Sequence, residues 1–264
     1  MILFWCEFPE TVDWARLEGL LKKHKLSVKA YITAISRHDF ENKKKEIEKF
    51  KGITVEGVWP ILTKARGYWF SGFTREEDID LLDEFEGIKM KVDIEPPITN
   101  SKSFKGMAFW LLKYVFKRQQ SREYLMKKVQ RLARKSPVIL STFPFPQWML
   151  RGYGFFLDKR LHYNYIFYST FIPEKFKERY RKYYKRFAKK RLKFDRNTFF
   201  ALGLLAPGIF QSEPVYKNVQ EFESDYNFLK GLGVKNFVIF RLGALTEMKD
   251  PEPWLKAIKR MSQP

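Results

Sequence analysis

The chain alternates short apolar runs with longer segments in which apolar residues recur at helical spacing. Short runs rich in Val, Ile, Phe and Tyr are typical of buried strands, and the longer segments are typical of amphipathic helices. We predict strands near residues 2–8, 27–36, 53–61, 88–95, 137–143, 163–172, 198–206 and 234–241. We predict helices near residues 11–24, 40–51, 75–86, 103–135, 174–193, 219–231 and 251–261. This alternation indicates a parallel α/β fold.

The number and order of these elements predict a (β/α)8 barrel of the TIM type, with residues 1–264 forming a single domain. Such barrels usually need about 250 residues. The fifth unit is an exception, because Phe143-Pro144-Phe145-Pro146 and an aromatic loop to Arg160 follow its strand. We therefore expect no regular helix in that unit. A doubly wound open sheet is the alternative architecture.

The composition favours a soluble cytoplasmic protein. Hydrophobic residues make up 45% of the chain, but the longest apolar runs, such as 199–205, are far shorter than the roughly 18 residues that span a bilayer. Residues 1–7 contain no basic region and end on a glutamate, which predicts a buried first strand and not a signal peptide. The single cysteine, Cys6, allows no internal disulfide. Abundant Lys, Arg and Glu with few Asn and Gln are typical of hyperthermophile proteins.

The strand predicted near 88–95 alternates apolar and charged residues. Ile88, Met90, Val92 and Ile94 share one phase, and Lys89, Lys91, Asp93 and Glu95 share the other. Because a barrel strand packs one face against the helices, the charged phase must point into the lumen. Buried charges are costly unless they pair or face a wet cavity. We therefore expect Lys91, Asp93 and Glu95 to form an inward column at the end of the barrel where active sites lie.

Other candidate site residues fall at predicted strand ends or in the loops after them. A sugar-active site would take acid/base carboxylates from Glu95 and Glu7 and flat apolar platforms from tryptophans. The candidates for substrate binding are Trp5, Trp59, Trp69, Trp148, Tyr168 and Arg241. The structural alternative is that Asp93 pairs with Lys91 or Arg241 and that the tryptophans only fill the core.

The tripeptide Asp93-Ile94-Glu95 resembles the end of the D-x-x-D-x-D-x-E signature of chitinase-like glycoside hydrolases. The resemblance implies that Glu95 is the general acid and that Asp93 orients a substrate acetamido group. This chain departs from the signature at the two earlier acids, where Ile88 and Lys91 stand. The resemblance therefore covers three residues and indicates sugar-active barrels in general.

Metal and cofactor sites are not expected. The three histidines, His24, His38 and His162, lack the spacing of metal ligands, although carboxylates could still hold Mg²⁺. There is no glycine-rich phosphate loop, and residues 240–244 offer only one arginine and one glycine for binding phosphate. Cys6 is expected to be a buried core thiol.

The net charge of +20 is concentrated in two segments. Residues 101–135 carry +10 and residues 174–196 carry +9, both in predicted helices. With no regular fifth helix between them, we expect these helices to form one basic flank, which would attract polyanions. The leading hypothesis is a sugar-active barrel. The competing one is a non-catalytic protein that binds nucleic acid, an anionic membrane surface or an acidic partner through this flank.

Overall fold

The computed structural model describes residues 1–98, 113–114, 116–117 and 119–263. Eight parallel strands follow one another around a closed barrel, and β8 pairs with β1 to complete it. The strands are β1 (Ile2–Cys6), β2 (Val28–Ala34), β3 (Ile53–Pro60), β4 (Met90–Asp93), β5 (Val138–Thr142), β6 (His162–Phe167), β7 (Phe199–Leu202) and β8 (Asn236–Phe240). The fold is a (β/α)8 barrel, as predicted, and the open-sheet alternative was wrong.

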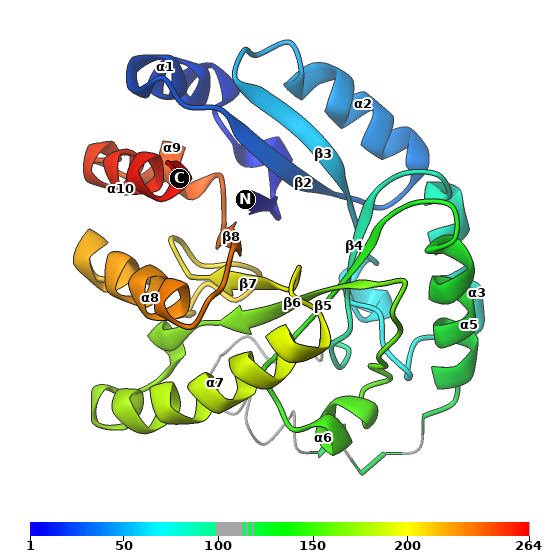
Figure 1. Cartoon of the computed structure of the whole chain (residues 1–264). Helices are drawn as coiled ribbons and strands as arrows, with labels where there is room; N and C mark the ends of the chain where they lie inside the picture. Colours follow the sequence, from blue (N-terminus) through cyan, green and yellow to red (C-terminus); the bar gives the residue numbers. More distant parts are fainter. Residues whose placement is uncertain (99–112, 115, 118, 264) are drawn as a thin grey trace.

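Helices surround the strands (Figure 1). They are α1 (Trp14–His24), α2 (Arg37–Ile47), α3 (Glu76–Ile79), α5 (Arg122–Leu132), α6 (Gln147–Arg151), α7 (Glu174–Phe194), α8 (Val219–Gly231), α9 (Ala244–Glu247) and α10 (Glu252–Ser262). Short 3-10 turns are η1 (Pro9–Thr11), η2 (Lys64–Arg66), η3 (Asp80–Phe85) and η4 (Ser169–Phe171). Among the described helices, none combines the length and the apolar character needed to cross a bilayer.

Two predicted helices differ in detail, and the fifth unit agrees with its prediction. The predicted helix 75–86 is divided into the short α3 and the 3-10 turn η3. The fifth unit holds only the five-residue α6, in agreement with the expected lack of a regular helix. Most of the predicted segment 103–121 lies outside the described residues, and α5 begins at Arg122.

The barrel has two apolar layers, which explains the alternation along β4. Met90 and Val92 belong to the large cluster between the strands and the helices. Lys91 and Asp93 point the other way and line a pocket in the lumen. A smaller cluster fills the lumen itself: Leu3, Trp5, Tyr31, Trp59, Ile139, Phe199, Ala201, Leu204, Val238 and Phe240.

The two basic segments differ in their surroundings. On α5, the Lys128 ammonium lies 2.7 Å from an Asp83 oxygen, and Arg131 of α5 and Lys135 just after it also pair with carboxylates of the segment 80–86. These three cations are therefore neutralised by their neighbours. Figure 1 shows α6 between α5 and α7, and most of the expected flank within residues 101–121 lies outside the described residues.

Candidate active site

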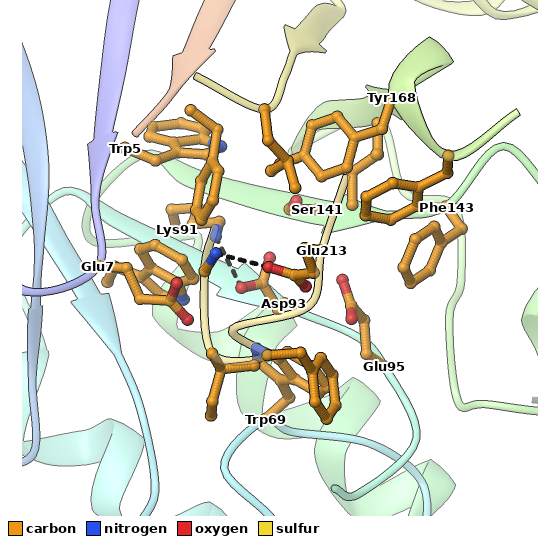
Figure 2. A pocket seen from close by; sticks show the side chains of 18 residues that line it. Trp5, Glu7, Trp69, Lys91, Asp93, Glu95, Ser141, Phe143, Tyr168 and Glu213 are labelled. Carbon is orange, nitrogen blue, oxygen red and sulfur yellow. Dashed lines mark hydrogen bonds and ion pairs between the residues drawn. The ribbon is translucent and has the colours of Figure 1, made fainter. Parts of the chain in front are cut away.

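A pocket lies at the carboxyl ends of the barrel strands (Figure 2), where active sites of this fold occur. It encloses about 610 Å³ of empty space, part of which is open to solvent. Its lining is acidic and aromatic. It includes Glu7, Asp93, Glu95, Glu213, Lys91, Trp5, Trp59, Trp69, Phe143, Tyr168, Phe171, Phe210 and Phe240.

Glu7 follows β1 and shares the inward phase of Trp5. Its side chain is buried, and Oε1 accepts a hydrogen bond of 3.1 Å from the hydroxyl of Tyr68. Oε2 is buried as well and has no hydrogen-bond partner among the described residues. Burial, followed by the negative charge of Glu213, raises the pKa of Glu7 to about 8. Glu7 is therefore a carboxyl group that holds its proton at neutral pH.

The backbone around Tyr68 has an unusual conformation. Tyr68 has φ 66°, in the left-handed region, and follows Gly67 with φ 104°. A non-glycine residue in this region costs free energy, and such residues cluster at functional sites. Here the Tyr68 hydroxyl reaches Glu7 and fixes one oxygen of its carboxyl group.

Lys91 and Asp93 form a buried ion pair in the lumen. The Lys91 Nζ lies 2.6 Å from Asp93 Oδ2 and 3.1 Å from the centre of the Trp59 ring. Burial lowers the pKa of Lys91, and the Asp93 carboxylate opposes this effect. The sequence allowed Asp93 to pair with Lys91 or Arg241, and the structure shows the pair with Lys91. The pair places the Lys91 side-chain nitrogen next to the acidic groups of the pocket.

Glu95 lies two residues beyond Asp93 in the same inward phase. It is buried, and burial together with the charge of Asp93 raises the pKa of Glu95 well above its usual range. Figure 2 shows Glu7 and Glu95 on opposite sides of the cluster, with Asp93 and Glu213 between them in this view. The carboxyl groups thus surround a common space.

Glu213 is a pocket residue that the sequence patterns did not predict. It comes from the loop after β7, and its Oε2 accepts a hydrogen bond of 2.5 Å from the backbone N–H of Gly208. Burial raises the pKa of Glu213 to about 7. The sequence held one indication, because Glu213 is the only acidic residue in the whole segment 197–220.

Gly208 shows how closely two of these carboxyl groups approach each other. A Cβ atom at this position would lie 2.7 Å from Glu7 Oε2 and 3.0 Å from Glu213 Oε2. Both oxygens therefore lie within 3.0 Å of the position that a Cβ atom would take, so any residue other than glycine would clash with them. The negative charge of Glu213 contributes to the raised pKa of Glu7, whereas burial raises the pKa of Glu213.

The aromatic residues predicted for substrate binding are distributed between the pocket and the surface. Trp5, Trp59, Trp69 and Tyr168 line the pocket. The indole N–H groups of Trp5 and Trp59 are buried and have no hydrogen-bond partner among the described residues. A bound polar molecule could satisfy such donors. Trp148, in contrast, lies on α6 and is 59% exposed.

Arg241 also lies outside the pocket lining. Its two terminal nitrogens each donate a 2.6 Å hydrogen bond to the carboxylate of Glu247, and its Nε donates to the carbonyl oxygen of Pro207. The guanidinium thus ties the loop after β7 to α9. These hydrogen bonds indicate a structural role for Arg241 and do not favour a role in substrate binding.

The remaining candidates take no part in the pocket. Cys6 is buried, and burial raises the pKa of its thiol. His38 lies on α2, where its Nε2 is 2.9 Å from Asn42 Nδ2. Within the described part of the chain, no group of three or more His, Cys, Asp or Glu residues is arranged to hold a metal ion.

Comparison with known proteins shows a likeness in fold only. No protein-family model matches the sequence, and no curated protein matches it. Among solved structures, the glycoside hydrolase domain of PgaB (BpsB) from Bordetella bronchiseptica superposes with a TM-score of 0.62 at 12% identity, covering 97% of this chain and 98% of that one. Dihydropteroate synthase from Anaplasma phagocytophilum reaches a TM-score of only 0.33 at 13% identity, with 94% and 76% covered. The first likeness extends over nearly the whole barrel.

Proposed function

We propose that the protein cleaves glycosidic bonds in the pocket at the carboxyl end of the barrel. The observation that carries this proposal is the convergence of Glu7, Asp93, Glu95 and Glu213 in one pocket with aromatic walls. Glycoside hydrolysis needs a protonated carboxyl group and an ionised one on either side of the scissile bond. The likeness in fold to a glycoside hydrolase domain supports the same class of reaction.

Glu95 is the proposed general acid. Burial and the charge of Asp93 raise the pKa of Glu95 well above its ordinary value, which favours the protonated form that can donate to the leaving-group oxygen. The resemblance of Asp93-Ile94-Glu95 to the chitinase-like signature assigns the same role to Glu95. Asp93 differs from the family pattern because Lys91 holds it in an ion pair. We assign to Asp93 the stabilisation of positive charge on the sugar ring in the transition state.

Glu7 and Glu213 are the proposed source of the ionised carboxylate. Their pKa values of about 8 and about 7 place one proton and one negative charge on the pair between about pH 7 and pH 8. The member of the pair that has lost its proton can act as base or nucleophile. Both carboxyl groups face the pocket that Glu95 faces.

The aromatic walls fit a carbohydrate. Sugar rings present flat apolar faces of C–H groups and polar edges of hydroxyls. The rings of Trp59, Trp69 and Tyr168 can pack on the faces. The unpartnered indole N–H groups of Trp5 and Trp59 can donate to the hydroxyl edges.

The test is an assay of the purified protein and its Glu95→Gln variant on a panel of neutral and N-acetylated oligosaccharides, with products separated by chromatography. General acid catalysis contributes about 10²- to 10⁴-fold, so we expect turnover to fall at least about hundredfold in the variant. Circular dichroism should show that the variant folds like the wild type.

Glu178→Gln is the matched control, since the side chain of Glu178 is 83% exposed and lies on the outside of α7. The control should retain full turnover. Wild-type turnover in Glu95→Gln would remove Glu95 as the acid. A wild-type protein that releases no product from any member of the panel would count against the whole proposal.

A further inference from the structure

The outer face of α7 carries an unusual density of unpaired positive charge. Eight of its Lys and Arg residues are exposed, and only Lys182 among them has a carboxylate partner, Glu178, within the described chain. The inward-facing cations behave differently, since Lys177 and Arg181 pair with Glu221 and Asp225 of α8. The structure therefore separates the paired cations of α7 from a free outer row that includes Arg179, Arg186 and Lys190.

Exposed aromatic rings lie along the edge of this row. Phe176, Tyr183 and Phe194 are 47%, 41% and 44% exposed, and their separations of 7 and 11 residues correspond to whole numbers of helical turns. They therefore form one stripe along α7, and its middle member, Tyr183, contacts the segment just before α6. Large apolar side chains arranged in this way on a surface indicate an interaction site.

The short helix α6 extends the same surface. Arg191 of α7 donates a 3.0 Å hydrogen bond to Gln147, and the hydroxyl of Tyr183 donates to the carbonyl oxygen of Pro144, so the two segments are packed together. Trp148, with 59% of its surface exposed, is the only tryptophan that is exposed among the described residues. The exposed Arg151 follows it one helical turn later.

We propose that this α6–α7 face binds the surface of an anionic lipid bilayer. Cations that flank exposed aromatic rings match the headgroup region, where lysine and arginine meet lipid phosphates and aromatic rings reach the acyl boundary. The exposed aromatic rings favour a lipid surface over a nucleic-acid duplex, whose phosphate backbone offers no apolar layer to receive them. The inner half of α7 is packed on the barrel, with Tyr184, Phe187 and Ala188 buried, so only this outer face is presented to a partner.

The test is sedimentation of the full-length protein with vesicles of phosphatidylglycerol and phosphatidylcholine, compared with vesicles of phosphatidylcholine alone. We expect binding only to the anionic vesicles, and we expect it to weaken as salt screens the charges. Each cation at an anionic surface contributes about 1 kcal/mol, or about fivefold in affinity. The affinity of the triple variant Arg179→Glu, Arg186→Glu, Lys190→Glu for anionic vesicles should therefore fall roughly hundredfold or more.

The matched control reverses three exposed lysines on α1, α2 and α10 (Lys22→Glu, Lys45→Glu, Lys256→Glu), which changes the net charge equally. The affinity of this control for anionic vesicles should stay within a few-fold of the wild-type affinity. If both triple variants lose affinity equally, net charge and not the α6–α7 face determines binding. That result would overturn the proposal. Tighter binding of single-stranded or duplex oligonucleotides than of anionic vesicles would overturn it in favour of nucleic acid.

A second measurement does not depend on the folding of the triple variant. Brominated lipids quench tryptophans that enter the bilayer, so anionic brominated vesicles should quench part of the wild-type fluorescence. Because Trp148 is the exposed tryptophan of the face, this quenching should disappear in Trp148→Phe. Equal quenching in the two proteins would contradict the proposed orientation.

Discussion

The carboxyl group of Glu7 should make the folded protein less stable as the pH rises. Its ordinary pKa of 4.5 applies to the unfolded chain, and burial next to Glu213 raises this pKa to about 8 in the folded protein. Because the folded state holds the proton more tightly, the stabilising contribution is complete below pH 4.5 and is lost as the pH rises through 8. At about 1.4 kcal/mol per pH unit, the total loss is about 5 kcal/mol.

The variant Glu7→Gln isolates this contribution because an amide does not titrate. The amide changes the free energy of unfolding by the same amount at every pH. The carboxyl group lowers the free energy of unfolding progressively as the pH rises. We expect the free energy of unfolding of Glu7→Gln, relative to the wild type, to rise by about 5 kcal/mol between acid pH and about pH 9. About 3 kcal/mol of this rise should be present at neutral pH.

Urea unfolding followed by circular dichroism across this pH range measures the difference directly. Glu77→Gln, which alters an exposed glutamate of α3, should follow the wild type at every pH. If the wild type and Glu7→Gln lose stability in parallel, the folded Glu7 has an ordinary pKa. In that case Glu7 would be ionised at neutral pH, and the proposed distribution of one proton and one negative charge over Glu7 and Glu213 would be wrong.

Two further predictions concern the neighbours of these carboxyl groups. Lys91→Met should destabilise the protein by about 3–5 kcal/mol at neutral pH, since it leaves the buried Asp93 without its cation; a loss below about 1 kcal/mol in urea unfolding would mean that water, not Lys91, stabilises Asp93. Tyr68→Phe removes the hydrogen bond that lowers the pKa of Glu7, so the midpoint of the pH-dependent loss of stability should move to higher pH. An unchanged midpoint in the same urea series would show that the hydroxyl does not act on Glu7.

Much of the fold follows from local patterns in the sequence. The strands were predictable because each is a short apolar run of fixed side-chain period, and eight of them in series define the barrel. The inward position of Lys91, Asp93 and Glu95 follows from the same period of two along β4. Glu7 and Trp5 could be placed at the pocket because they share a phase at the end of β1.

Other parts of the site depend on contacts that the sequence does not encode locally. Glu213 lies in a loop without periodicity and meets Glu7 only because both pack around Gly208. Arg241 sits at a strand end as predicted, but Glu247 engages its guanidinium. Trp148 follows Pro146 into a helix too short to bury it.

The pairing of surface cations is also not encoded locally in the sequence. The two basic segments carry nearly equal charge in the sequence, and composition alone cannot distinguish them. The structure separates them because Lys128 and its neighbours on α5 face Asp80 and Asp83, whereas the outer row of α7 has no such partners among the described residues.

The buried Cys6 gives the protein a practical advantage for spectroscopy. It is the only cysteine in the chain, it is 1% exposed, and its raised pKa keeps the reactive thiolate scarce. Thiol reagents should therefore leave the native protein unlabelled without any need to replace this residue. A cysteine introduced at Trp148 on α6, or at Lys256 on α10, would then carry a single spin label or fluorophore, and the pair of sites would report which side of the barrel meets a surface.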